Sequence, residues 1–226
     1  RDQPDLSAPE HYINREMSLL AFNRRVLEQA LDPTNPLLER LRFLCISSNN
    51  LDEFFEIRVA GLKQRLELGS DQAGPDGFTV AAQLQSIHAA TMEIVREQAR
   101  CLNEVLLPAM RTAGIELIPR TRWDDATKIW LERYFELEVE PVLSPLGLDP
   151  ARPFPRIQNK SLNFIVRLSG KDAFGRNSNL AIVQAPRSLP RVVPLPNNNG
   201  NVKRIVLLSA IVQHFVSSLF SGMEVL

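Results

Sequence analysis

Two consecutive asparagines, Asn49 and Asn50, stand directly before an acidic and aromatic run in the stretch SSNNLDEFFEIR, residues 47–58. An asparagine side chain offers a donor and an acceptor side by side, an arrangement that can pair with the edge of an adenine ring. Asparagine also caps helix starts well, and Glu53 stands three residues after Asn50, as in a capping box. The stretch therefore predicts a helix capped by Asn50, and it leaves open whether the amides also bind a ligand.

The remaining residues that could do chemistry are scattered. The three histidines, His11, His88 and His214, are far apart in the sequence, and none has a second ligand at metal-binding spacing. No phosphate-binding glycine loop is found in the sequence, and no pair of carboxylates stands out as an acid–base couple. We therefore predict no catalytic residue and no metal site within these 226 residues.

Composition places the chain among globular proteins with one or two domains, since 44% of its residues are apolar. No apolar run approaches the roughly 20 residues that span a bilayer, and the polar first residues are unlike a secretory signal. Cys45 and Cys101 both fall in apolar helical patterns, which predicts two small buried side chains and no disulfide. A cytoplasmic protein is expected, with association with a membrane surface left open.

The net charge of zero conceals an uneven distribution. Residues 151–226 carry ten lysines and arginines against two acidic residues. Such a basic segment can attract a polyanion through its field, and it can equally be a solvated sheet face or a subunit interface. Charge alone does not choose between these readings.

Apolar residues at helical spacing predict four helical segments in the first half of the chain. Pro33 is the stop signal of the first segment, Gly69 follows the third at the position of a left-handed cap, and Pro108 is expected to kink or end the fourth. Short connections predict an antiparallel helical bundle over residues 1–114. The predicted helix starts are Ser18, Asn35–Pro36, Asn50 and Thr79.

Residues 115–226 change to a mixed pattern. A hairpin is predicted for the runs SLNFIVRLS and NLAIVQAP. Further strands are predicted for IELIP, PRVVPLP and VKRIVLLS, and a helix is predicted with Asp124 or Asp125 as its cap. A last helix is predicted over Ala210–Phe220 with its cap at Ser209, whereas the proline-rich residues 140–156 show no regular pattern and the final MEVL has no predicted partner. The predicted class is α+β, an N-terminal all-α antiparallel helical bundle followed by an incomplete mixed α+β domain, and the chain is expected to be a fragment.

Residues 12–65, YINREMSLLAFNRRVLEQALDPTNPLLERLRFLCISSNNLDEFFEIRVAGLKQR, closely resemble the opening of the class-one polyphosphate kinases without a gap. The stretches PRIQNKSLNFIVRL and LFSGMEVL resemble the head domain that follows in that family, less tightly. The resemblance thus covers the whole chain, which corresponds to roughly the first third of a family member.

The resemblance implies an ATP:polyphosphate phosphotransferase, which reversibly transfers the terminal phosphate of ATP to inorganic polyphosphate through a phosphohistidine downstream of this chain. It implies that Asn50 contacts the adenine side of ATP, with Asn49 as its neighbour, and that Mg²⁺ is bound by residues outside these 226. Residues 1–114 would form one wall of the nucleotide site, and residues 115–226 would serve dimerisation and a phosphate tunnel. The implied partners are ATP or ADP, polyphosphate and further copies of the chain, as a homodimer or a higher oligomer.

These implications leave some points open. The basic residues could contact polyphosphate or a partner subunit, and assembly is the expected role of most of them. The chain by itself is expected to be inactive. The rival interpretations are a helical oligomerisation module without ligand chemistry of its own and a nucleic-acid-binding protein, but no nucleic acid is expected, because the basic segment has no recognisable reader motif. The basic residues concerned are Arg152, Arg156, Lys160, Arg167 and Lys203.

Overall fold

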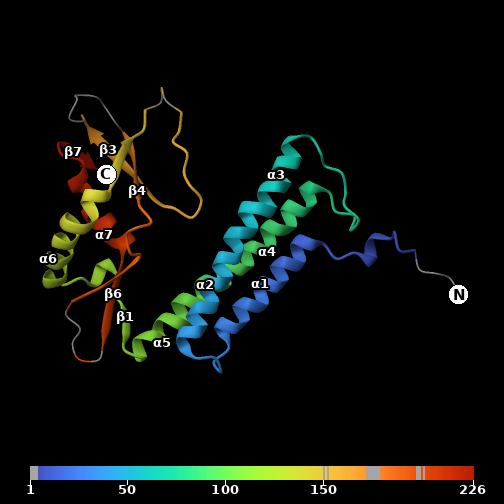
Figure 1. Cartoon of the computed structure of the whole chain (residues 1–226), viewed down its shortest axis with the longest axis horizontal. Helices are drawn as coiled ribbons and strands as arrows, with labels where there is room; N and C mark the ends of the chain where they lie inside the picture. The colour runs from blue at the N-terminus through green and yellow to red at the C-terminus, as the bar shows by residue number, and fades with distance from the viewer. Residues whose placement is uncertain (1–4, 150, 152, 172–178, 197–199, 201) are drawn as a thin grey trace. The chain divides into compact units, whose positions relative to one another are not determined.

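The computed structural model describes residues 5–149, 151, 153–171, 179–196, 200 and 202–226. The chain divides into two compact units, Arg1–Thr112 and Ala113–Leu226 (Figure 1). Each unit has its own cluster of buried apolar side chains, with Leu27, Ile87 and Leu106 among the most buried of the first, and Leu131, Phe135 and Val206 among those of the second.

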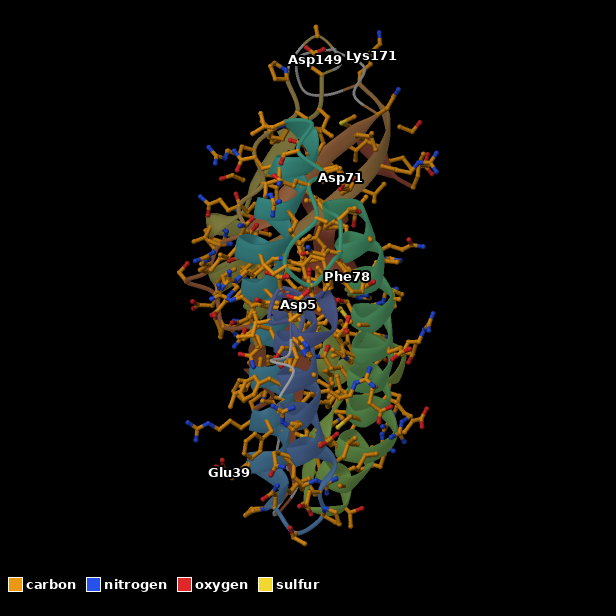
Figure 2. All side chains as sticks on the ribbon, turned by 90° about the vertical axis from the view of Figure 1, so that its right-hand side faces the viewer. Asp5, Glu39, Asp71, Phe78, Asp149 and Lys171 are labelled. Carbon is orange, nitrogen blue, oxygen red and sulfur yellow. The ribbon has the colours of Figure 1, made fainter. Side chains whose placement is uncertain are left out.

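The first unit is helical throughout its regular elements, and α1, α2 and α4 lie lengthwise beside one another (Figure 1). Figure 2 shows Glu39, which is near the start of α2, at one end of this bundle. Asp71 and Phe78 belong to the connection between α3 and α4 and lie towards the other end. The connection between α1 and α2, residues 32–36, is short, and short connections produce antiparallel neighbours. The helices are α1 (Arg15–Leu31), α2 (Leu37–Glu53), α3 (Ala60–Glu67), α4 (Val80–Arg100) and α5 (Leu107–Thr112).

The first helix starts earlier than its sequence pattern predicted. Asn14 caps α1, since its Oδ1 accepts a hydrogen bond from the backbone N–H of Met17 at 2.9 Å. The Asn14 Nδ2 also donates to Asp76 Oδ2 at 2.6 Å, and this second contact joins the start of α1 to the α3–α4 connection. The predicted cap at Ser18 is therefore wrong, because a residue with two partners outcompetes an exposed serine one turn later.

The prediction of a helix start at Asn50 is also wrong. The backbone is helical without a break from α2 through a π-helical segment, Phe54–Val59, into α3, so Asn50 lies inside a helix. Asparagine in a helix interior costs well under about 1 kcal/mol relative to alanine, and the buried stripe of Leu44, Ser47 and Leu51 outweighs that cost. The helix ends as predicted before Gly69, whose φ is 75°.

Wider π-helical turns adjust the register of two described helices of the first unit. In the first, Phe54 and Val59 are both buried although they are five residues apart, and Phe55 between them is 40% exposed. In the second, Cys101–Leu106, the same five-residue spacing separates two buried residues before Pro108. The helix then continues to Thr112, so Pro108 does not end it; the widened turn lies where a proline ring would otherwise meet the preceding turn.

Both cysteines are free thiols in different surroundings. Cys101 is fully buried, and this burial raises the pKa of its thiol. Cys45 is exposed, which corrects the prediction that both are buried.

In the described residues the second unit has two small sheets, two α-helices and a π-helical segment, Phe135–Val139, that continues the first of these helices. In one sheet β6 lies between β1, which is parallel to it, and β5, which is antiparallel. In the other, β4 pairs antiparallel with both β2 and β3, and β7 adds to the far edge of β3. The elements are β1 (Ile115–Leu117), α6 (Asp125–Tyr134), β2 (Ser144–Gly147), β3 (Leu162–Gly170), β4 (Leu180–Ala185), β5 (Val192–Pro194), β6 (Lys203–Leu207), α7 (Leu208–Phe215) and β7 (Met223–Val225).

Most of the predicted elements of this unit are confirmed, including the β3–β4 hairpin, whose predicted turn lies largely outside the described residues. Asp124 caps α6 by accepting from the N–H of Thr127 at 2.8 Å. Three details differ. Pro145 lies within β2, although no regular element was predicted there. Helix α7 begins at Leu208 without a side-chain cap, so Ser209 is not its cap. The final MEVL is paired, because Val225 lies opposite Leu168 of β3.

The fold class is therefore confirmed as a helical bundle followed by a mixed α+β unit. Among the described helices, none is long and apolar enough to cross a membrane.

Candidate functional site

The two predicted site residues have different surroundings in α2. Asn50 is partly buried and lines a groove between α1 and the α2–π-helical segment, whereas Asn49 is exposed and is not among the residues that line it. Consecutive residues on a helix point about 100° apart, so a helical backbone here separates the two amides. The groove therefore offers the amide of Asn50 to a ligand, and Asn49 stands beside it.

The groove has a volume of about 290 Å³, at the small end of the range for ligand pockets and suited to one ring system. Its walls are largely apolar, with the exposed rings and chains of Phe22 and Ile57 at 52% and 68% exposure. Apolar walls with one convergent amide are typical of a site for a flat heterocycle. The lining residues are Leu19, Leu20, Phe22, Asn23, Asn50, Leu51, Glu53, Phe54, Ile57 and Arg58.

A chain of hydrogen bonds runs inward from Asn50 across three helices. The Asn50 Nδ2 donates to Asn23 Oδ1 at 3.1 Å, and the Asn23 Nδ2 donates to the backbone carbonyl of Ser47 at 3.0 Å. The hydroxyl of Ser47 in turn accepts from Gln98 Nε2 at 2.9 Å. Asn23 and Ser47 are 3% and 0% exposed, so bulk water cannot replace these partners.

The contact with Asn23 uses one of the two N–H groups of Asn50. Among the described residues no further partner of the Asn50 side chain is found, so its second N–H and its Oδ1 remain for a ligand. A donor and an acceptor side by side match the N7 and amino edge of adenine.

The π-helical segment shapes the wall opposite α1. It begins directly after Glu53 and places Phe54 inward, where its ring meets that of Phe55 edge to face at a centroid distance of 5.9 Å. It also carries Arg58, which is among the residues that line the groove. Such π-helical turns often occur at functional sites, because they re-aim side chains without ending the helix.

Sequence patterns missed Asn23, Phe22 and Arg58 as members of this site. Asn23 had a detectable signal, since the buried residues of α1 recur as Leu20, Asn23 and Leu27, and an asparagine in a core stripe needs a partner. Phe22 carried none, because its approach to Asn50 depends on how α1 packs against α2. Arg58 is on the same continuous helix as Asn50, and its place in the lining depends on the register that the π-helical segment sets.

A second cavity of about 290 Å³ lies between α1 and α4. Its lining includes Glu28, Glu93 and Glu97, and the one arginine there, Arg24, forms an ion pair with Glu93 at 2.7 Å. Three carboxylates suit a nucleotide poorly, since phosphates repel them. The groove at Asn50 is therefore the better candidate for a nucleotide.

None of the three histidines is among the residues that line this groove. His11, His88 and His214 are all exposed. His214 packs edge to face against Trp123 at 5.2 Å, and partial burial, helped by the charge of Arg120, lowers its pKa. In the described part of the chain no three histidine, cysteine, aspartate or glutamate side chains gather as a metal site would require.

Most of the basic residues that the sequence singles out are at the surface of the second unit. Arg156, Lys160, Arg167 and Lys203 are exposed, and Arg152 lies outside the described residues. Arg167 and Lys171 border a further cavity of about 760 Å³ beside β3.

Comparisons with known proteins agree with one another. A model of the "Polyphosphate kinase N-terminal domain" matches residues 12–118, and one of the "Polyphosphate kinase middle domain" matches residues 126–226. Proteins named polyphosphate kinase from Xylella fastidiosa (strain Temecula1) and Pseudomonas aeruginosa are 52% and 51% identical over 219 and 215 residues. These alignments cover 96% and 95% of this chain.

The chain spans 31% of the length of both relatives. The crystal structure of polyphosphate kinase from Porphyromonas gingivalis matches with a TM-score of 0.81 at 30% identity, over 95% of this chain and 31% of that one. The resemblance that residues 12–65 carry is thus confirmed along nearly all of the sequence. The chain belongs to the polyphosphate kinase family.

Proposed function

We propose that this chain supplies the N-terminal part of an ATP:polyphosphate phosphotransferase, and that its first unit holds the adenine ring of ATP in the groove at Asn50. The observation that carries the proposal is a partly buried amide with free donor and acceptor positions in an apolar groove with an aromatic wall. Membership of the family supports a nucleotide and a polyphosphate chain as the two substrates.

The groove suits the base of a nucleotide better than its phosphates. Its volume fits one ring system, and its walls are mostly apolar, with Arg58 as the one positive charge among the residues that line it. We propose that the phosphates react outside these 226 residues, where a histidine is phosphorylated and Mg²⁺ is bound. None of the three histidines here lines the groove, which fits this division.

The second unit is proposed to serve assembly and the polyphosphate path. Its exposed basic side chains, Arg156 and Lys203 among them, suit either a polyanion or a partner subunit. A homodimer or a higher homo-oligomer is the proposed state of the enzyme.

The test is the substitution Asn50→Ala in a full-length enzyme that contains this chain. We expect the KM for ATP to rise roughly threefold to tenfold while kcat changes little, because a base contact far from the phosphates contributes equally to ground and transition states. The measurement is steady-state kinetics at saturating polyphosphate, with thermal melting to show that the variant is folded.

Asn49→Ala is the matched control, since this neighbour is exposed outside the groove. It should leave the KM for ATP unchanged. An Asn50→Ala enzyme with the ATP kinetics of the parent would contradict the proposal and favour the rival role of the helices as an oligomerisation module.

A further inference from the structure

In the hydrogen-bond chain behind Asn50, the backbone carbonyl of Ser47 determines which end of each side-chain amide donates and which accepts. A backbone carbonyl can only accept hydrogen bonds, so the side-chain atom of Asn23 that lies 3.0 Å from the Ser47 carbonyl must be the Nδ2 amide. The other end of the Asn23 amide, Oδ1, then faces Asn50. At 3% exposure, Asn23 cannot turn over and find water for its displaced groups.

The orientation of the Asn23 amide also determines the orientation of the Asn50 amide. Since Asn23 presents an acceptor, Asn50 must present its Nδ2, and the two atoms are 3.1 Å apart. If either amide turned over, two acceptors or two donors would face each other in a partly buried place, which costs more than a lost hydrogen bond. The Oδ1 of Asn50 is therefore held on the side of the groove.

We propose that Asn23 is a specificity-determining positioning residue, which holds the Asn50 amide with its acceptor toward the groove and so selects purines with an amino group at position 6. This inference rests on the proposed base contact of Asn50. Adenine carries an amino donor at that position, whereas hypoxanthine and guanine carry an oxygen acceptor. With the amide held in one direction, the oxygen at position 6 of an oxo purine meets the Oδ1 acceptor. With the amide free to turn, that oxygen can meet the Nδ2 donor instead, so the preference for a 6-amino purine falls.

Gln98 of the same network provides a matched control for the loss of hydrogen bonds alone. Gln98 donates to the Ser47 hydroxyl and not to the Ser47 carbonyl, so its removal leaves the link from Ser47 through Asn23 to Asn50 in place. A purely structural role of the network predicts that Gln98 and Asn23 variants behave alike. A directional role predicts that they differ.

The experiment compares ATP with inosine triphosphate, which replaces the 6-amino group by oxygen and adds no 2-amino group, in a full-length enzyme that contains this chain. Asn23→Leu keeps the volume but removes both amide contacts, and the ratio of kcat/KM for ATP to that for inosine triphosphate should fall about tenfold, equal to about 1.4 kcal/mol. Gln98→Leu should lower the melting temperature and leave the ratio unchanged. In Asn23→Asp the neutral acid can donate its O–H to the Ser47 carbonyl and still present its other oxygen to Asn50, so this variant should preserve the ratio.

A second measurement does not require nucleotide or activity. In the ¹⁵N-labelled 226-residue chain, the Asn50 side-chain proton that is hydrogen-bonded to Asn23 should exchange with solvent slowly, and faster by about tenfold or more in Asn23→Leu. Equal exchange rates in the two chains would overturn the inference, even if the full-length Asn23→Leu enzyme failed to fold.

The two proposals fail separately. If Asn50→Ala raises the KM for ATP but Asn23→Leu keeps the parent's preference for ATP, the positioning role is wrong and the base contact stands. If Asn50→Ala leaves the KM for ATP unchanged, the base contact itself is wrong, and the specificity role falls with it.

Discussion

The structural roles of single asparagines in the helical unit depend on hydrogen-bond partners that are distant in sequence. Asn14, Asn23 and Asn50 are all asparagines in or beside helices, yet one caps α1, one is buried between helices and one faces a groove. Helix propensity treats them alike, since asparagine is favoured at a cap and mildly disfavoured inside a helix. The residue type alone therefore could not assign these roles.

Asn14 provides a test at this scale. Substitution of Asn14 by alanine removes the cap on the Met17 N–H and the contact with Asp76, so the free energy of unfolding should fall by about 1–2 kcal/mol. Ser18→Ala, at the position that sequence capping rules favour, should change it by less than about 0.5 kcal/mol. Urea unfolding followed by circular dichroism measures both, and a larger loss in Ser18→Ala would contradict the assigned cap.

At the scale of elements, apolar periodicity predicted most helices and strands, and it failed where the backbone departs from ideal geometry. The hairpin of β3 and β4 was predictable because two β-rich runs flank a turn-rich one. The continuous helix through Asn50 was not, because the buried spacing of Phe54 and Val59 fits neither a regular helix nor a break. The groove was beyond prediction for the same reason, since its wall is this π-helical segment.

The π-helical segment should behave as a one-residue insertion. Deletion of Phe55, which is exposed, would place Phe54 and Val59 one regular helical step of four residues apart, and both could stay buried. The deletion should cost less than about 1.5 kcal/mol of unfolding free energy while altering the groove. Circular dichroism and urea unfolding check the first expectation, and ATP kinetics of the full-length enzyme check the second.

Deletion of Ala89, an exposed residue of α4, is the matched control. It lies between the buried Ile87 and Thr91 in regular helix, so every later side chain would turn by about 100° away from the core. We expect a loss of more than about 3 kcal/mol. Equal losses for the two deletions would show that the π-helical segment has no special tolerance.

At the scale of the whole molecule, the two units have separate buried clusters. The cluster of the first unit draws its side chains from α1 to α4 and the π-helical segments, all before residue 113. A core that closes within one stretch of sequence is the mark of a domain that can fold by itself.

Residues 1–112 produced alone should therefore keep their helical circular dichroism and unfold in one cooperative thermal transition. The reason is that the packing of α1, α2 and α4 is contained in this stretch. The 226-residue chain is the reference for the signal per helical residue. A gradual, non-cooperative loss of signal from the shorter chain would contradict the expectation.

The parallel pairing of β1 with β6 bears on the order of events during synthesis. Ile115 lies opposite Lys203, so the first strand of the second unit must wait for a partner that leaves the ribosome much later. Contacts between distant residues form slowly, whereas those of a helical bundle form early. The nascent protein should therefore expose an unpaired strand directly after an already folded helical unit, which makes this strand vulnerable to aggregation while translation proceeds.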